Sequence, residues 1–240
     1  MLSYACLDVL IIGEHMSKPK LLDLFSGTGG AARGYADAGF EVVGVDIVPQ
    51  PHYPYTFIQA DALTFPLDGF DVIHASPVCK GYTELNYRGK EKHEKLILPV
   101  KERLRQSGKV FVIENVSGAK LELPGALWLC GSQFGLSVWR HRLFESNILL
   151  FAPGPCKHTM RPISIHGDHV WNHSLHGTTR MTDGRIRPRQ VTFADGCKAM
   201  NIDWMTRQSE LSQAIPPAYT RWIGAQLITI LEGEALCTSR

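Results

Sequence analysis

Short apolar runs that alternate with helical patterns are the feature of this sequence that most constrains its fold. Five such runs predict buried strands: KLLDLF, EVVGVD, FDVIHAS, KVFVIEN and RLFESNILLF. Between the first two lies GGAARGYADAGF, a helical pattern that is closed by Gly39, so this part of the chain predicts a βαβ crossover. The alternation as a whole predicts an α/β fold with a mostly parallel sheet covered on both faces.

Two further helices are expected. EKHEKLILPVKERLRQSG, at 91–108, predicts a helix that is kinked or split at Pro99 and ends near Gly108. The later stretch PPAYTRWIGAQLITILEG has a proline at a plausible helix start and apolar residues at helical spacing. We expect this last helix to pack back on the sheet.

The strand and helix pattern breaks after Phe151, where Gly, Pro, Thr, Arg and His dominate. A chain of 240 residues with 44% hydrophobic residues can bury one large core with a small appendage. We therefore expect four parts: an N-terminal extension at 1–19, with Met16 as an alternative start to Met1; a main domain at 20–151; a small irregular insert at 152–195; and a segment at 196–240 that returns to the main domain.

The excess positive charge of the chain is concentrated in the insert. A net charge of +2 is too small to indicate a nucleic-acid partner by itself. Between Phe151 and Met200, however, seven basic residues stand against three acidic ones, an excess of about four positive charges. We therefore expect a basic surface there that contacts nucleic acid. The alternative is a basic loop that is only solvated.

The cysteines and the N-terminus indicate a reducing compartment. The six cysteines are scattered without a CxxC pair, which predicts free thiols and no disulfide. No apolar stretch is long enough to span a bilayer, and no secretory signal pattern precedes Lys20. We expect a soluble cytoplasmic protein with no membrane partner.

A glycine-rich turn follows the first predicted strand. In DLFSGTGG the glycines let the backbone approach a ligand, and the helix that follows offers unpaired N–H groups. Asp46 ends the second strand, where it could bond a ribose hydroxyl, and Asp61 follows the next short run. The alternatives are a tight turn with an exposed carboxylate at Asp46 and a helix or turn cap at Asp61. Acid-bearing loops at successive strand ends would meet at one sheet edge and form a ligand crevice.

Two reactive groups come next in the same series. Cys79 follows the third strand in an irregular, cationic setting between Pro77 and Lys80, where a thiolate could be stabilised. Glu114 ends the apolar run VFVI, and apolar surroundings would raise its pKa and keep it able to donate a proton. A buried inert thiol and a strand-end cap are the alternatives.

The ordered set of motifs resembles the DNA cytosine carbon-5 methyltransferases. The motifs are DLFSGTGG, VGVDI, QADAL, SPVCKGY, ENV, RHRLFES and LSQAIPPAY, and they cover nearly everything except the insert. The resemblance implies a Rossmann-like fold that binds S-adenosyl-L-methionine and acts on cytosine in DNA. The base would be flipped out of the duplex, and a cysteine would form a covalent adduct with it.

The resemblance also implies the role of each site residue. The catalytic residues would be Cys79, Glu114, Arg140 and Arg142. The cofactor-binding residues would be Phe25, Ser26, Gly27, Thr28, Gly29, Gly30, Asp46, Ile47, Asp61, Ala62, Pro77, Gln213 and Ala214. The insert corresponds in position to the target recognition region, and the DNA-binding residues would be Lys80, Arg180, Arg185, Arg187 and Arg189.

This sequence departs from the family pattern at a few positions. Val78 and Lys80 replace a proline and a glutamine around Cys79. Val138 and Trp139 replace a glutamine before the arginine pair, and Ser212 and Gln213 replace a late Gly-Asn pair. The catalytic side chains themselves are intact.

Alternatives to this function stay open at the sequence level. One branch of the same family acts on RNA, and a catalytically inactive relative would bind DNA only. We expect a stand-alone, monomeric enzyme, either an orphan or the partner of a restriction enzyme.

The histidine-rich insert raises the question of a metal. Cys156 and five histidines crowd into residues 156–176, so zinc could staple the insert, but their spacing matches no standard finger. We therefore expect no metal ligands.

Overall fold

The computed structural model describes residues 17–82, 93–159, 162–166, 169–172, 178–180, 186–188 and 192–238. Its centre is a seven-stranded sheet in the order β3-β2-β1-β4-β5-β7-β6. The strands are β1 (Lys20–Leu24), β2 (Glu41–Asp46), β3 (Thr56–Gln59), β4 (Val72–Ala75), β5 (Val110–Val116), β6 (Leu127–Leu129) and β7 (Arg142–Ser146).

The sheet is mostly parallel, as the sequence predicts. β3, β2, β1, β4 and β5 run in the same direction, whereas β7 pairs antiparallel with both β5 and β6. The four residues of β4 are all buried, and so is β1 after its first residue, because helices cover both faces of the sheet. The chain has a Rossmann-like α/β fold.

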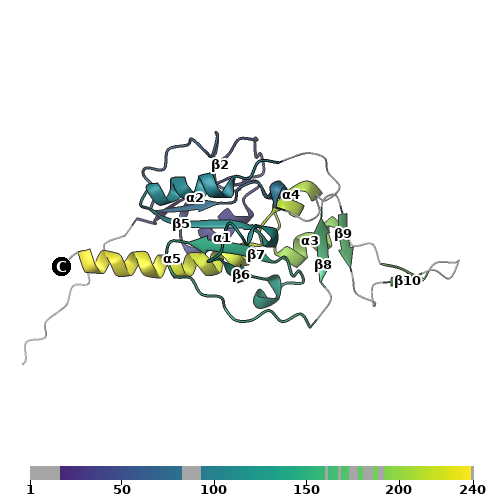
Figure 1. The fold of residues 1–240 in the computed structure, drawn as a ribbon. Coiled ribbons are helices and arrows are strands. Elements are labelled where there is room, and N and C mark those ends of the chain that lie inside the picture. Colours follow the sequence, from purple (N-terminus) through teal and green to yellow (C-terminus); the bar gives the residue numbers. More distant parts are fainter. Residues whose placement is uncertain are drawn as a thin grey trace, which may run out of the picture.

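Helices form a layer on each face of the sheet (Figure 1). On one face, α1 (Gly30–Ala38) and α5 (Pro217–Thr238) share a core with the sheet around Tyr35, Phe144 and Tyr219. On the other face, α2 (Ile97–Gln106) buries Ile97, Val100 and Leu104 against the sheet. The prediction that the C-terminal helix packs back on the sheet is confirmed. Among the described residues, no helix combines the length and the apolar character needed to cross a membrane.

The helix boundaries agree with the sequence at α1 and differ at α2. α1 ends at Gly39, which adopts a left-handed conformation with φ of 119°. The prediction of a helix kinked or split at Pro99 is wrong: α2 begins only at Ile97, and residues 93–96 are not helical. Pro99 therefore lies in the first turn, where a missing N–H breaks no helical hydrogen bond.

The described part of the insert contains two short antiparallel ribbons. β8 (Ile163–His166) pairs with β9 (His169–Asn172), and β10 (Thr178–Arg180) pairs with β11 (Ile186–Pro188). Ile165 of β8 is buried in a third apolar cluster with residues of α3 (Phe193–Met200) and α4 (Gln208–Gln213). This cluster joins the base of the insert to the main domain, and β10 projects away from it (Figure 1).

α1 and α5 approach each other closely at Gly34. A Cβ atom built there would overlap the Pro217 carbonyl oxygen and the Thr220 hydroxyl of α5. The Thr220 hydroxyl donates to the Ala31 carbonyl oxygen at 2.8 Å, so both helices are held at this spacing. Only glycine fits at this position without moving one helix.

Gly34→Ala should therefore destabilise the protein by about 1–3 kcal/mol, because the added methyl group must separate α1 from α5. Urea unfolding measures this loss as a lower midpoint at an unchanged slope. Gly233→Ala is the matched control, since Gly233 also lies in a helix but has open space around it. The control should be neutral or more stable by up to about 1 kcal/mol, and equal effects in both variants would contradict the packing argument.

Candidate active site

Several predicted site residues lie at or after the carboxyl ends of five adjacent strands. Asp61 comes after β3, Asp46 ends β2, the segment 25–30 follows β1, Pro77 and Cys79 follow β4, and Glu114 lies in β5. The parallel strands point the same way, so these positions share the carboxyl edge. The prediction that acid-bearing loops meet at one edge is confirmed.

The glycine-rich turn is a close-packed loop between β1 and α1. Phe25 and Gly29 have left-handed backbones, with φ of 57° and 82°. A Cβ at Gly29 would lie 2.7 Å from Cδ of Pro54, and one at Gly30 would lie 2.5 Å from the Ile215 carbonyl oxygen. The loop therefore needs glycine at both positions, and it rests on the segment before α5.

The remaining loop residues are fixed by neighbouring elements. The Ser26 N–H donates to the Val45 carbonyl oxygen at 3.1 Å. Thr28 donates through its hydroxyl to Gln50 at 3.3 Å, and its carbonyl oxygen accepts from the Trp204 indole at 2.9 Å. These hydrogen bonds tie the loop to β2, to Gln50 and to Trp204.

Asp46 is oriented by two backbone donors. Its Oδ2 accepts from the Gly27 N–H at 3.0 Å, and its Oδ1 accepts from the Val48 N–H at 2.9 Å. A carboxylate oxygen can accept more than one hydrogen bond, so Asp46 still has capacity for a hydroxyl ligand. Beside it the apolar side chain of Ile47 is 68% exposed, which offers a surface for a flat ring.

Asp61 acts as a turn cap in the structure. Its Oδ1 accepts from the Leu63 N–H at 2.8 Å, and its carbonyl oxygen accepts from the Thr64 N–H at 3.2 Å. This geometry matches the alternative that the sequence left open. Ala62 beside it is buried. Any contact of Asp61 or Ala62 with a cofactor stays a prediction.

Cys79 lies on an exposed turn whose base is anchored. It begins the short helix η1 (Cys79–Gly81), and its thiol is exposed, as is the side chain of Lys80. Pro77 is buried, and its carbonyl oxygen accepts from Nδ2 of Asn115 at 2.8 Å. Asn115 of the ENV motif therefore positions the turn that carries the thiol.

Glu114 is a buried carboxyl group with a cationic partner. Its Oε1 lies 3.1 Å from Nε of Arg142, and the carboxyl group also accepts from Ser76. Burial raises its pKa above the usual range, while Arg142 and Ser76 oppose that rise. Burial therefore favours the protonated form of Glu114, and the ion pair with Arg142 opposes it.

Arg140 connects the arginine pair to the segment before α5. Its Nε donates to the Ala214 carbonyl oxygen at 2.8 Å, and a terminal nitrogen donates to the Ser212 carbonyl oxygen at 2.5 Å. Burial, and then Arg142, lower the pKa of Arg140 to about 9, so it stays charged at neutral pH. Its charge interacts with Glu114 and Cys79. Ala214 is buried, whereas the Gln213 side chain is exposed.

A buried polar chain that the sequence reasoning missed leads to Glu114. The Tyr35 hydroxyl lies 3.0 Å from Nδ1 of His74, and Nε2 of His74 lies 2.9 Å from the Ser76 hydroxyl, which bonds Glu114. Burial lowers the pKa of His74 to about 3, so the ring is neutral and offers one donor and one acceptor. His74 and Ser76 stand two residues apart in the strand pattern FDVIHAS, a spacing that could have indicated a shared face.

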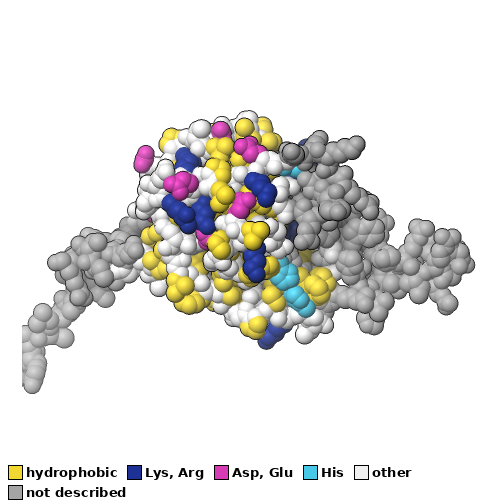
Figure 2. All heavy atoms as spheres, viewed as in Figure 1, with side chains coloured by type: hydrophobic (Ala, Val, Ile, Leu, Met, Phe, Trp, Pro, Cys, Tyr) yellow, Lys and Arg dark blue, Asp and Glu magenta, His cyan; other side chains and the backbone are white. Residues whose placement is uncertain are grey.

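The predicted DNA-binding residues are only partly described. Arg180 ends β10, and Arg187 in β11 pairs with Thr179 across the ribbon. Arg185 and Arg189 lie outside the described residues. On the face drawn in Figure 2, basic and acidic side chains of the main domain are interspersed. The described part of that face carries no broad basic patch. The assignment of DNA contacts to the insert stays a prediction.

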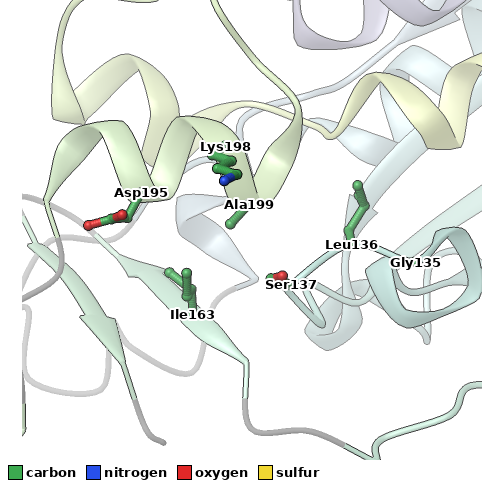
Figure 3. A pocket seen from close by; sticks show the side chains of 7 residues that line it. All are labelled: Gly135, Leu136, Ser137, Ile163, Asp195, Lys198 and Ala199. Carbon is green, nitrogen blue, oxygen red and sulfur yellow. The ribbon is translucent and has the colours of Figure 1, made fainter. Parts of the chain in front are cut away.

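A small pocket lies at the base of the insert (Figure 3). Ile163 of β8 faces Ala199 and Lys198 of α3 across it, and its wall is completed by Gly135, Leu136, Ser137 and Asp195. None of the predicted catalytic or cofactor residues lines this pocket. The site is therefore better defined by the carboxyl edge of the sheet.

No protein-family model matches the sequence, and no curated protein sequence matches it. Solved structures do resemble it. A candidate DNA modification methyltransferase encoded within an E. coli prophage is 14% identical with a TM-score of 0.60, covering 90% of this chain and 100% of the other. The S. pombe Dnmt2 methyltransferase is 14% identical with a TM-score of 0.59, covering 89% and 99%.

A third structure, the Entamoeba histolytica methyltransferase EhMeth, is 12% identical with a TM-score of 0.50, covering 89% of this chain and 99% of its own. At these identities the likeness shows the fold. The chain therefore has the Rossmann-like fold of structures that are described as methyltransferases.

The buried His74 should make the protein sensitive to acid. An unfolded histidine binds a proton below about pH 6.5, but folded His74 binds one only near pH 3, so stability is lost as the pH falls between these values. His74 should account for about 2 kcal/mol of the stability lost between pH 8 and pH 5. Urea unfolding of wild type and His74→Gln at both pH values measures this contribution.

The loss of stability between pH 8 and pH 5 should be smaller in His74→Gln than in wild type by about 2 kcal/mol, whatever the absolute stability of the variant. The raised pKa of Glu114 acts in the opposite direction, but it is present in both proteins and cancels in the comparison. An identical loss in both proteins would contradict the assignment of a neutral buried imidazole.

Proposed function

We propose that the chain is a methyltransferase that moves a methyl group from S-adenosyl-L-methionine to carbon 5 of cytosine in DNA. The observation that carries the proposal is the convergence of an exposed thiol at Cys79, the buried Glu114 and the cations Arg140 and Arg142 at one sheet edge. In the sequence, the same four residues match the catalytic motifs of the DNA cytosine carbon-5 methyltransferases. The structural likeness to methyltransferases supports the same class of reaction.

The cofactor would bind beside this group of residues, over the carboxyl ends of β1 and β2. The glycine-rich segment 25–30 brings backbone close to a ligand, and the start of α1 offers N–H groups. Asp46 is oriented to accept from ribose hydroxyls, and Ile47 would lie against the adenine ring. Gln213 and Ala214 would close the pocket from the segment before α5.

The chemistry requires a nucleophile because carbon 5 of cytosine is too weakly nucleophilic to take a methyl group directly. The Cys79 thiolate would add to carbon 6 and push electron density onto carbon 5. Glu114 would hydrogen-bond ring nitrogen 3 and neutralise the charge that develops there. Arg142 and Ser76 would keep the Glu114 carboxyl group oriented toward the ring.

Carbon 5 would then attack the methyl group of the bound S-adenosyl-L-methionine. The bond between that methyl group and the sulfonium sulfur would break, and S-adenosylhomocysteine would leave as a neutral thioether. A base would remove the proton from carbon 5, and the electron pair of that C–H bond would re-form the ring double bond as the Cys79 thiolate departs. The thiol is therefore regenerated, and one methyl group replaces one proton on the base.

The substrate must present its ring edge outside the base stack. Neither carbon 5 nor carbon 6 can meet Cys79 and the cofactor within a stacked duplex, so the cytosine would be flipped out. Lys80 beside the thiol, and the arginines of the insert, would contact phosphates and hold the DNA during this step. A short insert predicts a short or relaxed recognition sequence.

Cys79→Ala should abolish methyl transfer, by at least about 10³-fold, because no thiolate remains to activate carbon 5. The experiment follows label from S-adenosylmethionine into mixed-sequence DNA and, separately, into RNA, with digestion to nucleosides and mass identification. Wild type should give 5-methyldeoxycytidine from DNA. Calorimetry should show unchanged S-adenosylmethionine affinity in the variant.

Cys197→Ala is the matched control, since Cys197 is a partly buried thiol on α3 outside the candidate site. The control should keep full activity. Label in RNA alone would reject DNA as the substrate. Label at another atom of the base, or full activity in Cys79→Ala, would reject the covalent mechanism.

A further inference from the structure

Four ligand-type side chains meet beside the arginine pair. Cys130, His141, Cys156 and His158 place one sulfur or nitrogen atom each within 4.8 Å of one another. Sγ of Cys130 lies 3.3 Å from Nε2 of His158, and Sγ of Cys156 lies 3.6 Å from Nε2 of His141. The cluster lies outside the set of residues assigned to methyl transfer.

These separations fit a tetrahedral metal. With Zn–S near 2.3 Å and Zn–N near 2.0–2.1 Å, tetrahedral geometry puts a sulfur and a nitrogen ligand about 3.5–3.6 Å apart. The two measured sulfur–nitrogen distances lie close to this value. Both histidines turn the same atom, Nε2, toward a thiol, so each ring keeps Nδ1 for an outer partner.

The surrounding residues hold the four groups in place. The His158 ring stacks on Trp139 at 4.1 Å between centroids, with an interplanar angle of 18°. The His141 ring meets the edges of both His158 and Trp128, and histidine side chains lie together at the surface in Figure 2. The backbone that carries Cys130 is tied to Trp139 by a hydrogen bond from the Gly131 N–H at 2.8 Å.

The cluster joins three separate segments of the chain. Cys130 follows β6 and His141 precedes β7, which are antiparallel neighbours at the sheet edge. Cys156 and His158 come from the start of the insert, which folds back so that the Lys157 N–H donates to the Ser132 hydroxyl at 3.1 Å. A bound ion would therefore fasten the insert to the edge of the main sheet.

We propose that Cys130, His141, Cys156 and His158 form a structural zinc site. Two thiolates and two imidazoles are a ligand set that Zn²⁺ prefers, whereas Mg²⁺ and Ca²⁺ prefer oxygen ligands. All four tetrahedral positions come from protein, which is the arrangement of a structural rather than a catalytic ion.

The site would also position the arginine pair. His141 lies between Arg140 and Arg142, so an ion on its ring fixes the backbone from which both guanidinium groups extend. Arg142 bonds Glu114, and Arg140 bonds Ala214. Zinc binding by these four side chains does not require methyl-transfer activity.

The test measures metal on the full-length protein, purified under reducing conditions without chelator. Elemental analysis should find about one Zn²⁺ per chain. After removal of the metal, Co²⁺ should bind at one equivalent with the intense visible absorption of a tetrahedral site that has thiolate ligands, and Zn²⁺ should displace it. These readouts need no methyltransferase activity.

Two exposed ligands provide the variants. Cys156→Ser and His158→Gln should each weaken Zn²⁺ binding by more than about 100-fold, measured by competition with a chromophoric chelator, because loss of even an outer-shell partner typically costs about 10- to 100-fold. Cys197→Ser is the control, since it removes a thiol outside the cluster and should bind Zn²⁺ as wild type does.

Wild-type protein that contains no zinc and binds none after reduction would overturn the proposal, and this outcome does not depend on the folding of any variant. So would a Cys130–Cys156 disulfide found by mass spectrometry in protein alkylated at lysis, because it would leave no thiolates for a metal. Unchanged Zn²⁺ affinity in both ligand variants would overturn it as well.

Discussion

Parallel pairing of β3, β2, β1, β4 and β5 is the constraint on which the rest of the structure depends. Since these five strands run in one direction, every loop that follows them opens at the same edge of the sheet. Residues far apart in sequence, such as Asp46, Cys79 and Glu114, therefore share one surface. The helices on both faces exclude water from the sheet and leave this edge as the place where polar side chains gather.

The segment before and within α5 completes the edge from the other end of the chain. The carbonyl oxygens of Ser212 and Ala214 accept from Arg140, and the Tyr219 hydroxyl donates to the Arg140 carbonyl oxygen at 2.9 Å. Ile215 packs against Gly30 at the start of α1. Hydrogen bonds and packing thus connect α5, the glycine-rich loop and the arginine pair, so the late motif and the first motif lie side by side.

The sequence predicts those parts of the fold and of the candidate site that depend on patterns of neighbouring residues. Short apolar runs identified β1, β2, β4, β5 and β7, and Gly39 identified the end of α1. β3 and β6 were not among the five predicted strands, because β3 is mostly exposed and β6 has only three residues. The start of α2 was misplaced because Pro99 fits the first turn of a helix as well as a kink. The strand-end residues were found because one parallel sheet brings them together. The contact of His74 with Tyr35 and the cluster of Cys130, His141, Cys156 and His158 depend on pairings between distant segments, which spacing along the sequence does not reveal.

In the proposed reaction, Cys79 attacks carbon 6 of cytosine and carbon 5 then takes the methyl group. A duplex that carries 5-fluorocytosine at the mapped target tests this directly, because fluorine cannot be removed as a proton is and the cycle stops after methyl transfer. In the presence of S-adenosylmethionine, mass spectrometry of the digested complex should find the methylated fluorocytosine joined to the peptide that contains Cys79. Turnover without an adduct, or an adduct on another residue, would contradict the covalent mechanism through Cys79.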